Sequence, residues 1–145
     1  MSDNPSPRVR FTEEPIEIPA DVGTADTTGR ADAANGAVVT FSGVVRNRND
    51  GRDVLGIFYE CYREMATQEA TRLIAEIEGE FPVRVDRMAH RVGELLPGDV
   101  SLVVVIRSAH RRAAFDAMST FVDRFKDRVP VWKKERYADD TASWL

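Results

Sequence analysis

Hydrophobic and polar residues follow two different periods along this chain. Short runs of β-branched and apolar residues, several of them alternating with polar ones, predict β-strands. These strands cover residues 9–18, 37–45, 54–59, 83–90, 100–106 and 131–137. The run at 100–106 is almost continuously apolar, which is typical of a central strand. Pro15 places the first strand at a sheet edge, because proline has no N–H to donate to a neighbouring strand.

Apolar residues recur every three or four positions in two longer stretches, and this spacing predicts helices over residues 65–78 and 110–128. The first helix is expected to bury Ala66, Ala70, Leu73, Ile74 and Ile77. The second is expected to bury Ala114, Phe115, Met118, Val122 and Phe125. We expect Ser108 to cap the second helix. Pro130 ends that helix and biases Val129 to an extended conformation.

The strands at 37–45 and 54–59 flank a polar segment, 47–51, that is rich in turn-forming residues. This arrangement predicts a β-hairpin with a long polar tip. Gly43 and Gly56, inside the two strands, indicate bulges or the close approach of another backbone. A hairpin followed by a helix, two strands, a helix and a strand is typical of the α+β class.

A chain of 145 residues fits one domain, which we place at residues 9–145 after a disordered tail at 1–8. Residues 19–35 are interpreted as a loop or a short helix. The polar N-terminus has no apolar stretch typical of a signal peptide, and no apolar run approaches the ~20 residues of a membrane span. The single Cys61 excludes an internal disulfide and favours a small buried residue in a reducing compartment. These features predict a cytoplasmic protein.

The charge balance limits the choice of ligands. A net charge of -4 and a pI near 5.2 argue against general nucleic-acid binding, although they allow a local basic pocket. Two His and one Cys, without the spacing of a known ligand motif, predict no metal site. The sequence also has no phosphate-binding glycine motif and no nucleophile elbow. We therefore expect no cofactor.

Two lysines flank the predicted end of the second helix. Lys126 lies in its last turn and Lys133 lies on the following strand, while Pro130 turns the chain between them. Their amines are therefore candidates to converge on one cavity, where paired ammonium groups bind an anion well. The alternative is that Lys126 complements the helix dipole and Lys133 is solvated.

The sequence His110-Arg111-Arg112 opens the second helix, where cations oppose the helix dipole. A bound anion would compensate, because free N–H groups and arginine both favour phosphate. The alternative is an exposed basic turn. Arg46 ends a strand and either reaches a pocket at the strand mouth or belongs to a polar turn. His90 is interpreted as structural.

Several short segments, in this order and spacing, resemble the family of large, catalytic subunits of molybdopterin synthase. The resemblance runs from about residue 36 to residue 144. The segments that carry the resemblance lie in three parts of the chain. The first comprises residues 36–41, 43 and 45–47, and the second comprises 90–95 and 97–99. The third comprises 108–111, 114–115, Lys126, Pro130, 132–133 and Glu135.

The resemblance implies a reaction and an assembly. The family converts cyclic pyranopterin monophosphate to molybdopterin by installing two sulfurs as a dithiolene. Sulfur arrives as a thiocarboxylate on the C-terminal Gly-Gly of a small ubiquitin-like carrier subunit, whose tail enters a pocket on the large subunit. Large subunits form the homodimer core of a heterotetramer. The implied fold has a hammerhead-like α/β part and an added antiparallel β-sheet.

The resemblance also assigns residues. Lys126 and Lys133 are the implied catalytic lysines, and Arg46, His110 and Arg111 the implied pterin- and phosphate-binding residues. The family's pocket lies near the dimer interface, so His110 and Arg111 are expected to serve the neighbouring protomer's site. The last two implied residues are Lys134 and Glu135, which flank the second lysine and are expected to line the same wall.

The chain departs from the family pattern at Val44, where some relatives carry lysine. Two other functions stay open. One is a non-catalytic module of the same fold that binds a ubiquitin-like tail or an anionic ligand. The other is an RNA-binding domain, which the acidic pI disfavours.

Overall fold

The structure is a computed structural model that describes residues 8–18, 33–139 and 141–145. The predicted tail at 1–8, except Arg8, lies outside the described residues. So does most of the predicted loop or short helix at 19–35.

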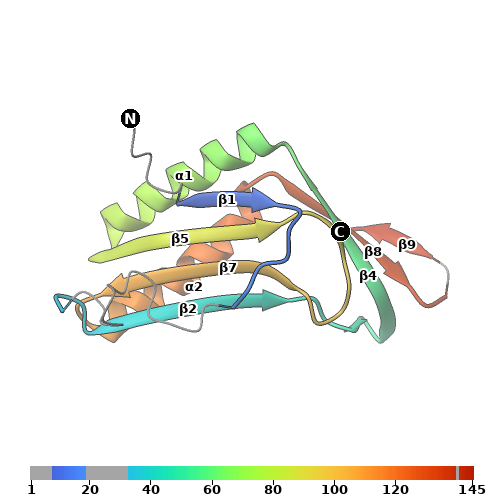
Figure 1. The fold of residues 1–145 in the computed structure, drawn as a ribbon, viewed down its shortest axis with the longest axis horizontal. Coiled ribbons are helices and arrows are strands. Elements are labelled where there is room, and N and C mark those ends of the chain that lie inside the picture. The colour runs from blue at the N-terminus through green and yellow to red at the C-terminus, as the bar shows by residue number, and fades with distance from the viewer. Residues whose placement is uncertain (1–7, 19–32, 140) are drawn as a thin grey trace.

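The first sheet has four strands in the order β1-β5-β7-β2 (Figure 1). Its strands are β1 (Val9–Thr12), β5 (Val83–Arg91), β7 (Val100–Ser108) and β2 (Ala37–Val44). β1 runs parallel to β5, whereas β7 is antiparallel to both of its neighbours. The predictions of a central strand at 100–106 and of an edge position for the first strand are confirmed.

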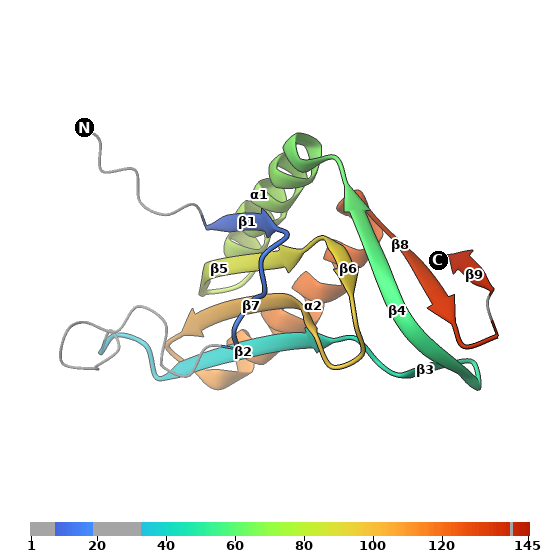
Figure 2. The same ribbon diagram turned by 45° about the vertical axis from the view of Figure 1, so that its right-hand side comes forward.

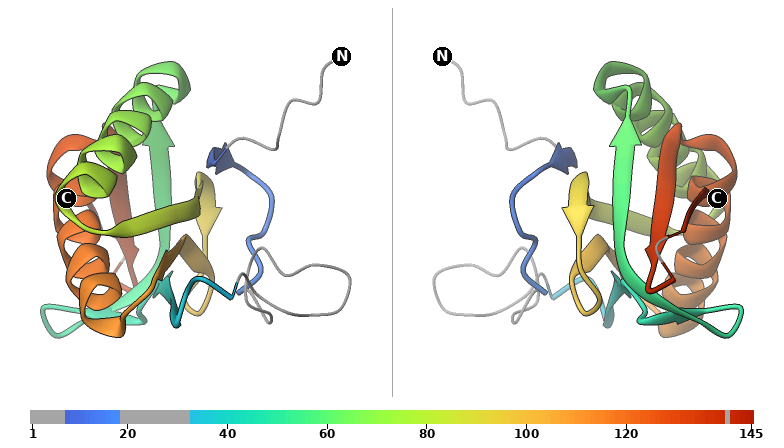
Figure 3. Two further views of the ribbon diagram at one scale, coloured as in Figure 1. Left: turned by 90° about the vertical axis from the view of Figure 1, so that its left-hand side faces the viewer. Right: turned by 90° about the vertical axis from the view of Figure 1, so that its right-hand side faces the viewer.

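Both helices pack against one face of this sheet (Figure 3, left). The helix α1 (Arg63–Glu80) buries the five residues that its spacing predicts. The helix α2 (Arg111–Arg128) buries its predicted residues except Phe115, which is 58% exposed. Ala117 and Phe121 complete the buried stripe instead, because they lie three and seven positions after Ala114 and so share its side of the helix.

The expected N-cap of α2 was wrong. The N-cap is His110, and its side chain makes no capping hydrogen bond. β7 continues to Ser108, so this serine ends a strand and is almost fully buried. Its hydroxyl accepts a hydrogen bond from the His110 N–H at 3.1 Å and donates one to the His110 carbonyl at 2.5 Å. Ser108 thus fixes the turn between β7 and α2.

A second, antiparallel sheet lies beyond one end of the first (Figure 2). Its order is β3-β4-β8-β9, and β6 also pairs with β4. These strands are β3 (Arg48–Asn49), β4 (Arg52–Cys61), β8 (Val131–Tyr137), β9 (Ala142–Trp144) and β6 (Gly93–Leu95). The α+β class with an added antiparallel sheet is confirmed, and β8 has the predicted bounds.

The predicted hairpin between 37–45 and 54–59 was wrong. β2 pairs with β7, whereas β4 pairs with β8 and β6. The turn at Asp50 and Gly51, both with positive φ, joins β4 only to the two-residue β3. The turn residues therefore determine only the pairing of β3 with β4. The strand β2 is held in the first sheet, where its apolar face packs against α2. The expected irregularities at Gly43 and Gly56 are confirmed as shifts in strand register.

Among the described residues, no helix is long and apolar enough to cross a membrane.

Candidate functional site

A pocket of about 530 Å³ lies where the two sheets meet. Three cations line it: Arg46 from the segment just after β2, Lys126 from the last turn of α2, and Lys133 from β8. The structure thus brings together the two predicted lysines and one predicted arginine. Three cations around a single cavity form a site suited to an anionic ligand.

A short connection between α2 and β8 places the two lysines. The Val129 N–H donates to the Phe125 carbonyl at 3.0 Å and closes the helix. The Val131 N–H then donates to the Val129 carbonyl at 2.8 Å across Pro130, so the chain turns tightly into β8. Phe125 is buried and anchors the last helical turn, which leaves Lys126 at the pocket.

His90 lies in the wall of this pocket and is only 5% exposed. Its ring stacks on Phe125 at 5.7 Å and meets the edge of Tyr59 at 4.9 Å between ring centroids. Its Nδ1 lies 2.7 Å from the Arg91 carbonyl, so Nδ1 carries the proton and donates to that oxygen. Burial, together with the smaller effect of the nearby Lys133 charge, lowers the pKa of His90 to about 4. The imidazole is therefore neutral at pH 7.

Tyr59 and Glu135 extend the wall on the Lys133 side. The pKa of Tyr59 is raised, chiefly by burial and also by the negative charge of Glu135, so the phenol stays protonated. Glu135 is buried, and both of its carboxylate oxygens accept from the Asn49 side-chain amide at 3.1 Å. A smaller cavity of about 70 Å³ is lined by Tyr59, Lys133 and Glu135. Glu135 thus lies beside Lys133, as expected.

Lys134 does not line this pocket, which corrects the expectation that it shares a wall with Glu135. Successive residues of a strand point to opposite faces, so Lys134 faces away from Lys133. Its Nζ lies 5.6 Å from the centre of the Trp144 ring on the other side of the sheet.

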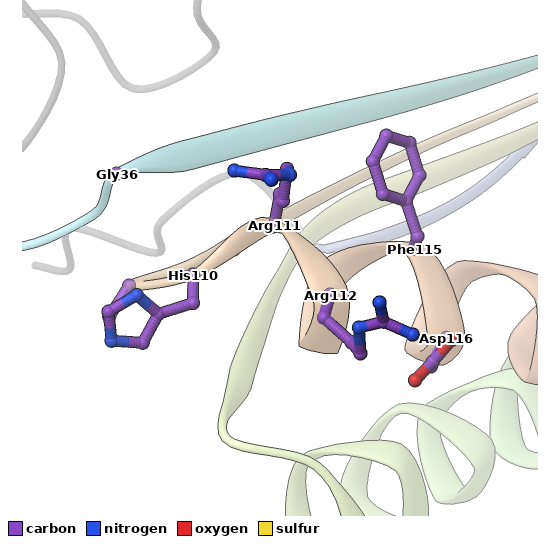
Figure 4. Close-up of a pocket in the computed structure, with 7 residues that line it drawn as sticks. Gly36, His110, Arg111, Arg112, Phe115 and Asp116 are labelled. Carbon is purple, nitrogen blue, oxygen red and sulfur yellow. The ribbon is translucent and has the colours of Figure 1, made fainter.

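The basic residues before and at the start of α2 line a separate pocket of about 540 Å³ (Figure 4). His110, Arg111 and Arg112 contribute to it, together with Gly36 and Phe115. Gly36 precedes the first residue of β2, whereas Gly43 and Val44, at the other end of β2, line the lysine pocket. Within one chain, His110 and Arg111 therefore lie away from the two lysines.

Sequence reasoning did not place His90 and Tyr59 in the site. His90 was interpreted as structural, and its ring contacts agree with that role, yet it also borders the pocket. One signal for His90 was alternation, since Met88 and His90 share the inward face of β5. Nothing local connects Tyr59 with Lys133, because their pairing joins strands far apart in the chain.

The described residues offer neither a metal-binding cluster nor a reactive cysteine. Within the described ranges, no group of three or more His, Cys, Asp or Glu side chains is placed to hold a metal ion. Cys61 is a free, half-buried thiol whose pKa is raised by burial, so it is a poor nucleophile at neutral pH.

Comparison with known sequences gives consistent results. The model of the family described as "MoaE protein" matches residues 11–128. The molybdopterin synthase catalytic subunit of Thermoplasma volcanium is 38% identical over 136 residues, covering 94% of this chain and 96% of the relative. The molybdopterin synthase catalytic subunit of Mesorhizobium japonicum is 39% identical over 141 residues, covering 97% of this chain and 86% of the relative.

Solved structures have the same fold. A molybdopterin synthase structure from Staphylococcus aureus aligns with a TM-score of 0.81 at 29% identity, covering 96% of this chain and 97% of that one. A chain from a complex of subunits 1 and 2 of the molybdopterin-converting factor from Helicobacter pylori aligns with a TM-score of 0.63 at 23% identity. The alignment covers 77% of this chain and 73% of that one. At that identity, the second comparison concerns the fold alone.

Proposed function

The chain belongs to the MoaE protein family, and from this premise we propose that it is a sulfur-transferring catalytic subunit of molybdopterin synthase. Its donor is the C-terminal thiocarboxylate of a small ubiquitin-like carrier. Its acceptor is cyclic pyranopterin monophosphate, which becomes the dithiolene of molybdopterin. The observation that carries the proposal is the meeting of Lys126, Lys133 and Arg46 in one pocket.

The two lysines suit the transfer step. Once the carrier sulfur has bonded to the pterin, water adds to the acyl carbon and the carbon–sulfur bond breaks. Negative charge develops on the acyl oxygen, the sulfur stays on the pterin, and the carrier is left with a carboxylate. Ammonium groups fixed beside that oxygen stabilise the charge without reorganisation, or exchange protons with the reacting groups. The neutral imidazole of His90 and the protonated phenol of Tyr59 add no charge to the wall beside the lysines.

Arg46 is assigned to the substrate phosphate. Arg46 lines both the lysine pocket and the neighbouring small cavity. A guanidinium can hold a phosphate through two parallel hydrogen bonds. Its contribution is expected mainly in substrate binding.

We assign His110 and Arg111 to the site of a neighbouring protomer in a homodimer. β2 is the last strand of the first sheet, so its outer edge is unpaired in the described chain. A two-fold axis beside this edge runs the second β2 antiparallel to the first. That arrangement brings the His110 pocket of the second copy next to the lysine pocket of the first, because the two pockets lie at opposite ends of β2.

The carrier subunit completes the proposed assembly as a heterotetramer, with one carrier per lysine pocket. We expect the protein to work in the cytoplasm, where its single thiol stays reduced.

Single-turnover mass spectrometry tests the proposal. Purified protein is mixed with a thiocarboxylated Gly-Gly carrier and cyclic pyranopterin monophosphate, and the carrier mass and the dithiolene product are followed. The variants Lys126→Ala and Lys133→Ala should each slow the loss of sulfur from the carrier by ~10²-fold or more, because they remove charge stabilisation in the transition state.

Arg72→Ala is the matched control. Arg72 is an exposed cation on α1 that pairs with Glu69, away from the pocket, and its removal should leave the rate unchanged. A folded Lys126→Ala protein with the full transfer rate would refute the catalytic assignment. A wild-type protein that binds the carrier without turnover would indicate the non-catalytic module instead.

A further inference from the structure

A buried carboxylate beside the lysine pocket has fewer hydrogen-bond partners than its burial requires. Glu135 is only 4% exposed. Its oxygens accept from one group, the Asn49 side-chain amide, whose Nδ2 lies 3.1 Å from each of them. In the part of the chain that the structure describes, no lysine or arginine forms an ion pair with Glu135. A buried charge is costly unless its acceptor positions are filled, so this carboxylate has room for a further donor.

Glu135 lines the small cavity of about 70 Å³ that adjoins the lysine pocket. Arg46, Tyr59 and Lys133 line both spaces, so the two are neighbours. A water molecule needs a cavity of about 10–15 Å³ and two to four polar partners, and the small cavity offers both. It is too small for the substrate. We call it the water cavity.

Strand geometry separates the carboxylate from the lysines. Lys133 and Glu135 lie two residues apart on β8 and therefore share one face of the strand. Lys133 borders both spaces, whereas Glu135 and Asn49 line only the water cavity. Asn49 comes from β3, on the other side of β4 from β8 (Figure 2). The cations thus face the large pocket, and the carboxylate lies behind them.

We propose that the water cavity supplies the water molecule that releases the carrier, with Glu135 as its base and Asn49 as the residue that positions Glu135; this inference rests on the proposed function. Sulfur transfer first leaves the carrier's terminal carbonyl joined to the pterin through sulfur. In the proposed function the acyl oxygen lies against the lysines. Its carbon is therefore next to the space that Lys133 shares with Glu135.

The release step is a hydrolysis. The water oxygen bonds to the acyl carbon while one of its protons passes to the Glu135 carboxylate. The carbon–sulfur bond breaks, and its electron pair stays with the sulfur on the pterin. The new carboxyl group ionises, which leaves a carboxylate on the carrier and a thiolate on the pterin. Glu135 then returns its proton to solvent.

Asn49 suits the positioning role because its amide is neutral. One Nδ2 holds both carboxylate oxygens from the same side, so their remaining lone pairs are directed elsewhere. A cation in this place would stabilise the charged carboxylate more strongly and make it a weaker base. Arg48 also lines the water cavity, but its guanidinium is paired with Asp53 at 3.1 Å.

Quenched single-turnover mass spectrometry tests the water cavity, because it resolves the covalent carrier–pterin adduct from the released carrier. With thiocarboxylated carrier and cyclic pyranopterin monophosphate, Glu135→Gln should form the adduct at the wild-type rate. It should then release the carrier ~10²-fold or more slowly, the usual effect of losing a general base. Asn49→Ala should accumulate the same adduct with a smaller slowing of ~10-fold, because the base is then misplaced but present.

Glu69→Gln is the matched control. It makes the same change to a carboxylate on α1 that pairs with Arg72, away from both spaces, and should alter neither step. Wild-type turnover in ¹⁸O-labelled water gives a readout without any variant: the released carrier should carry the label in its terminal carboxylate. Thermal unfolding checks that each variant folds.

The outcomes separate this inference from the proposed function. Wild-type protein that forms neither adduct nor product overturns both. Wild-type turnover without ¹⁸O in the carrier overturns the inference alone. So does Glu135→Gln protein that releases the carrier at the wild-type rate, or that slows both steps equally, since the change then acts on binding.

Two further outcomes concern particular residues. The unprotonated nitrogen of His90 is the competing base in the pocket wall. Adduct that accumulates in His90→Phe but not in Glu135→Gln would therefore overturn the assignment of Glu135. If Glu135→Gln does not fold, Asn49→Ala decides: accumulated adduct supports the water cavity, and release at the wild-type rate overturns it.

Discussion

At the residue scale, the site depends on which side chains keep their charge. Lys133, on β8, brings a cation to the pocket, whereas the buried His90 beside it remains neutral. Burial disfavours the imidazolium, and the neighbouring ammonium disfavours it further. The hydrogen bond to the Arg91 carbonyl raises the pKa but is outweighed by burial, so the pKa still falls to about 4. Positive charge is therefore confined to the lysines and Arg46.

The low pKa of His90 predicts a pH-dependent stability. The unfolded chain protonates this residue near pH 6.5, but the folded protein does so only near pH 4. The unfolded state therefore binds more protons between these values, and the free energy of unfolding should fall as the pH drops from about 6.5 to about 4. The full difference corresponds to roughly 3 kcal/mol.

Urea unfolding at several pH values between 4 and 7 measures this contribution. His90→Phe keeps an aromatic ring against Phe125 and should show a shallower loss of stability than wild type over this window. His110→Ala changes the other histidine, which lies outside the buried wall, and should retain the wild-type slope. Equal slopes for wild type and His90→Phe would contradict the prediction.

At the scale of elements, the approach of β2 to the start of α2 positions the second pocket. The Gly36 N–H donates to the Ala109 carbonyl at 3.2 Å, immediately before His110. A Cβ atom at position 36 would lie 2.5 Å from that same carbonyl oxygen, closer than packed atoms allow. Only glycine fits here without moving the loop that carries His110.

Gly36→Ala should therefore destabilise the protein by about 1–3 kcal/mol, the usual cost of forcing atoms into a packed region. Gly79→Ala is the opposing control: it lies in α1 with no atom within 4 Å of its added Cβ, so it should stabilise the helix by up to about 1 kcal/mol. The midpoints of urea unfolding measure both changes. An unchanged midpoint for Gly36→Ala would show that the loop adjusts freely.

At the scale of the whole molecule, two pockets with basic linings lie at opposite ends of one edge strand. The lysine pocket contains Gly43 and Val44 at the end of β2, and the basic pocket contains Gly36 just before its start. In the proposed dimer, a two-fold axis about this edge would complete each site with residues from both copies, and neither copy would form a complete site alone.

Mixed dimers test the shared site. In a dimer of one Lys133→Ala chain and one Arg111→Ala chain, one site has both changes and the other has none, so activity should exceed that of either parent dimer. A mixture of Lys126→Ala and Lys133→Ala chains is the control, because every site then lacks one lysine and no recovery is expected. Isolated mixed dimers of the first pair that stay at parental activity would show that His110 and Arg111 serve their own chain.

The sequence by itself determined both helices, the six longer strands, the buried face of α1 and a candidate meeting of the two lysines. The buried face of α1 and the bounds of β8 follow from local periodicity, and Lys126 and Lys133 meet across the short turn at Pro130. These features depend on residues close together in the chain, whose geometry is fixed by helix and strand periods. The resemblance supplied the family and the implied roles of these residues.

Only the tertiary structure decided which distant segments meet. In the folded chain, β2 and β4 belong to different sheets, and Lys134 lies on the outer face of the second sheet. Phe115 is exposed, and His90 and Tyr59 lie beside the lysines. Strand pairing between distant segments is selected by the burial available to whole faces, which local turn residues such as those at 47–51 do not specify. A shift of one residue along a strand reverses the face that each side chain occupies, so the composition of a site at a sheet junction is settled only when the register is fixed.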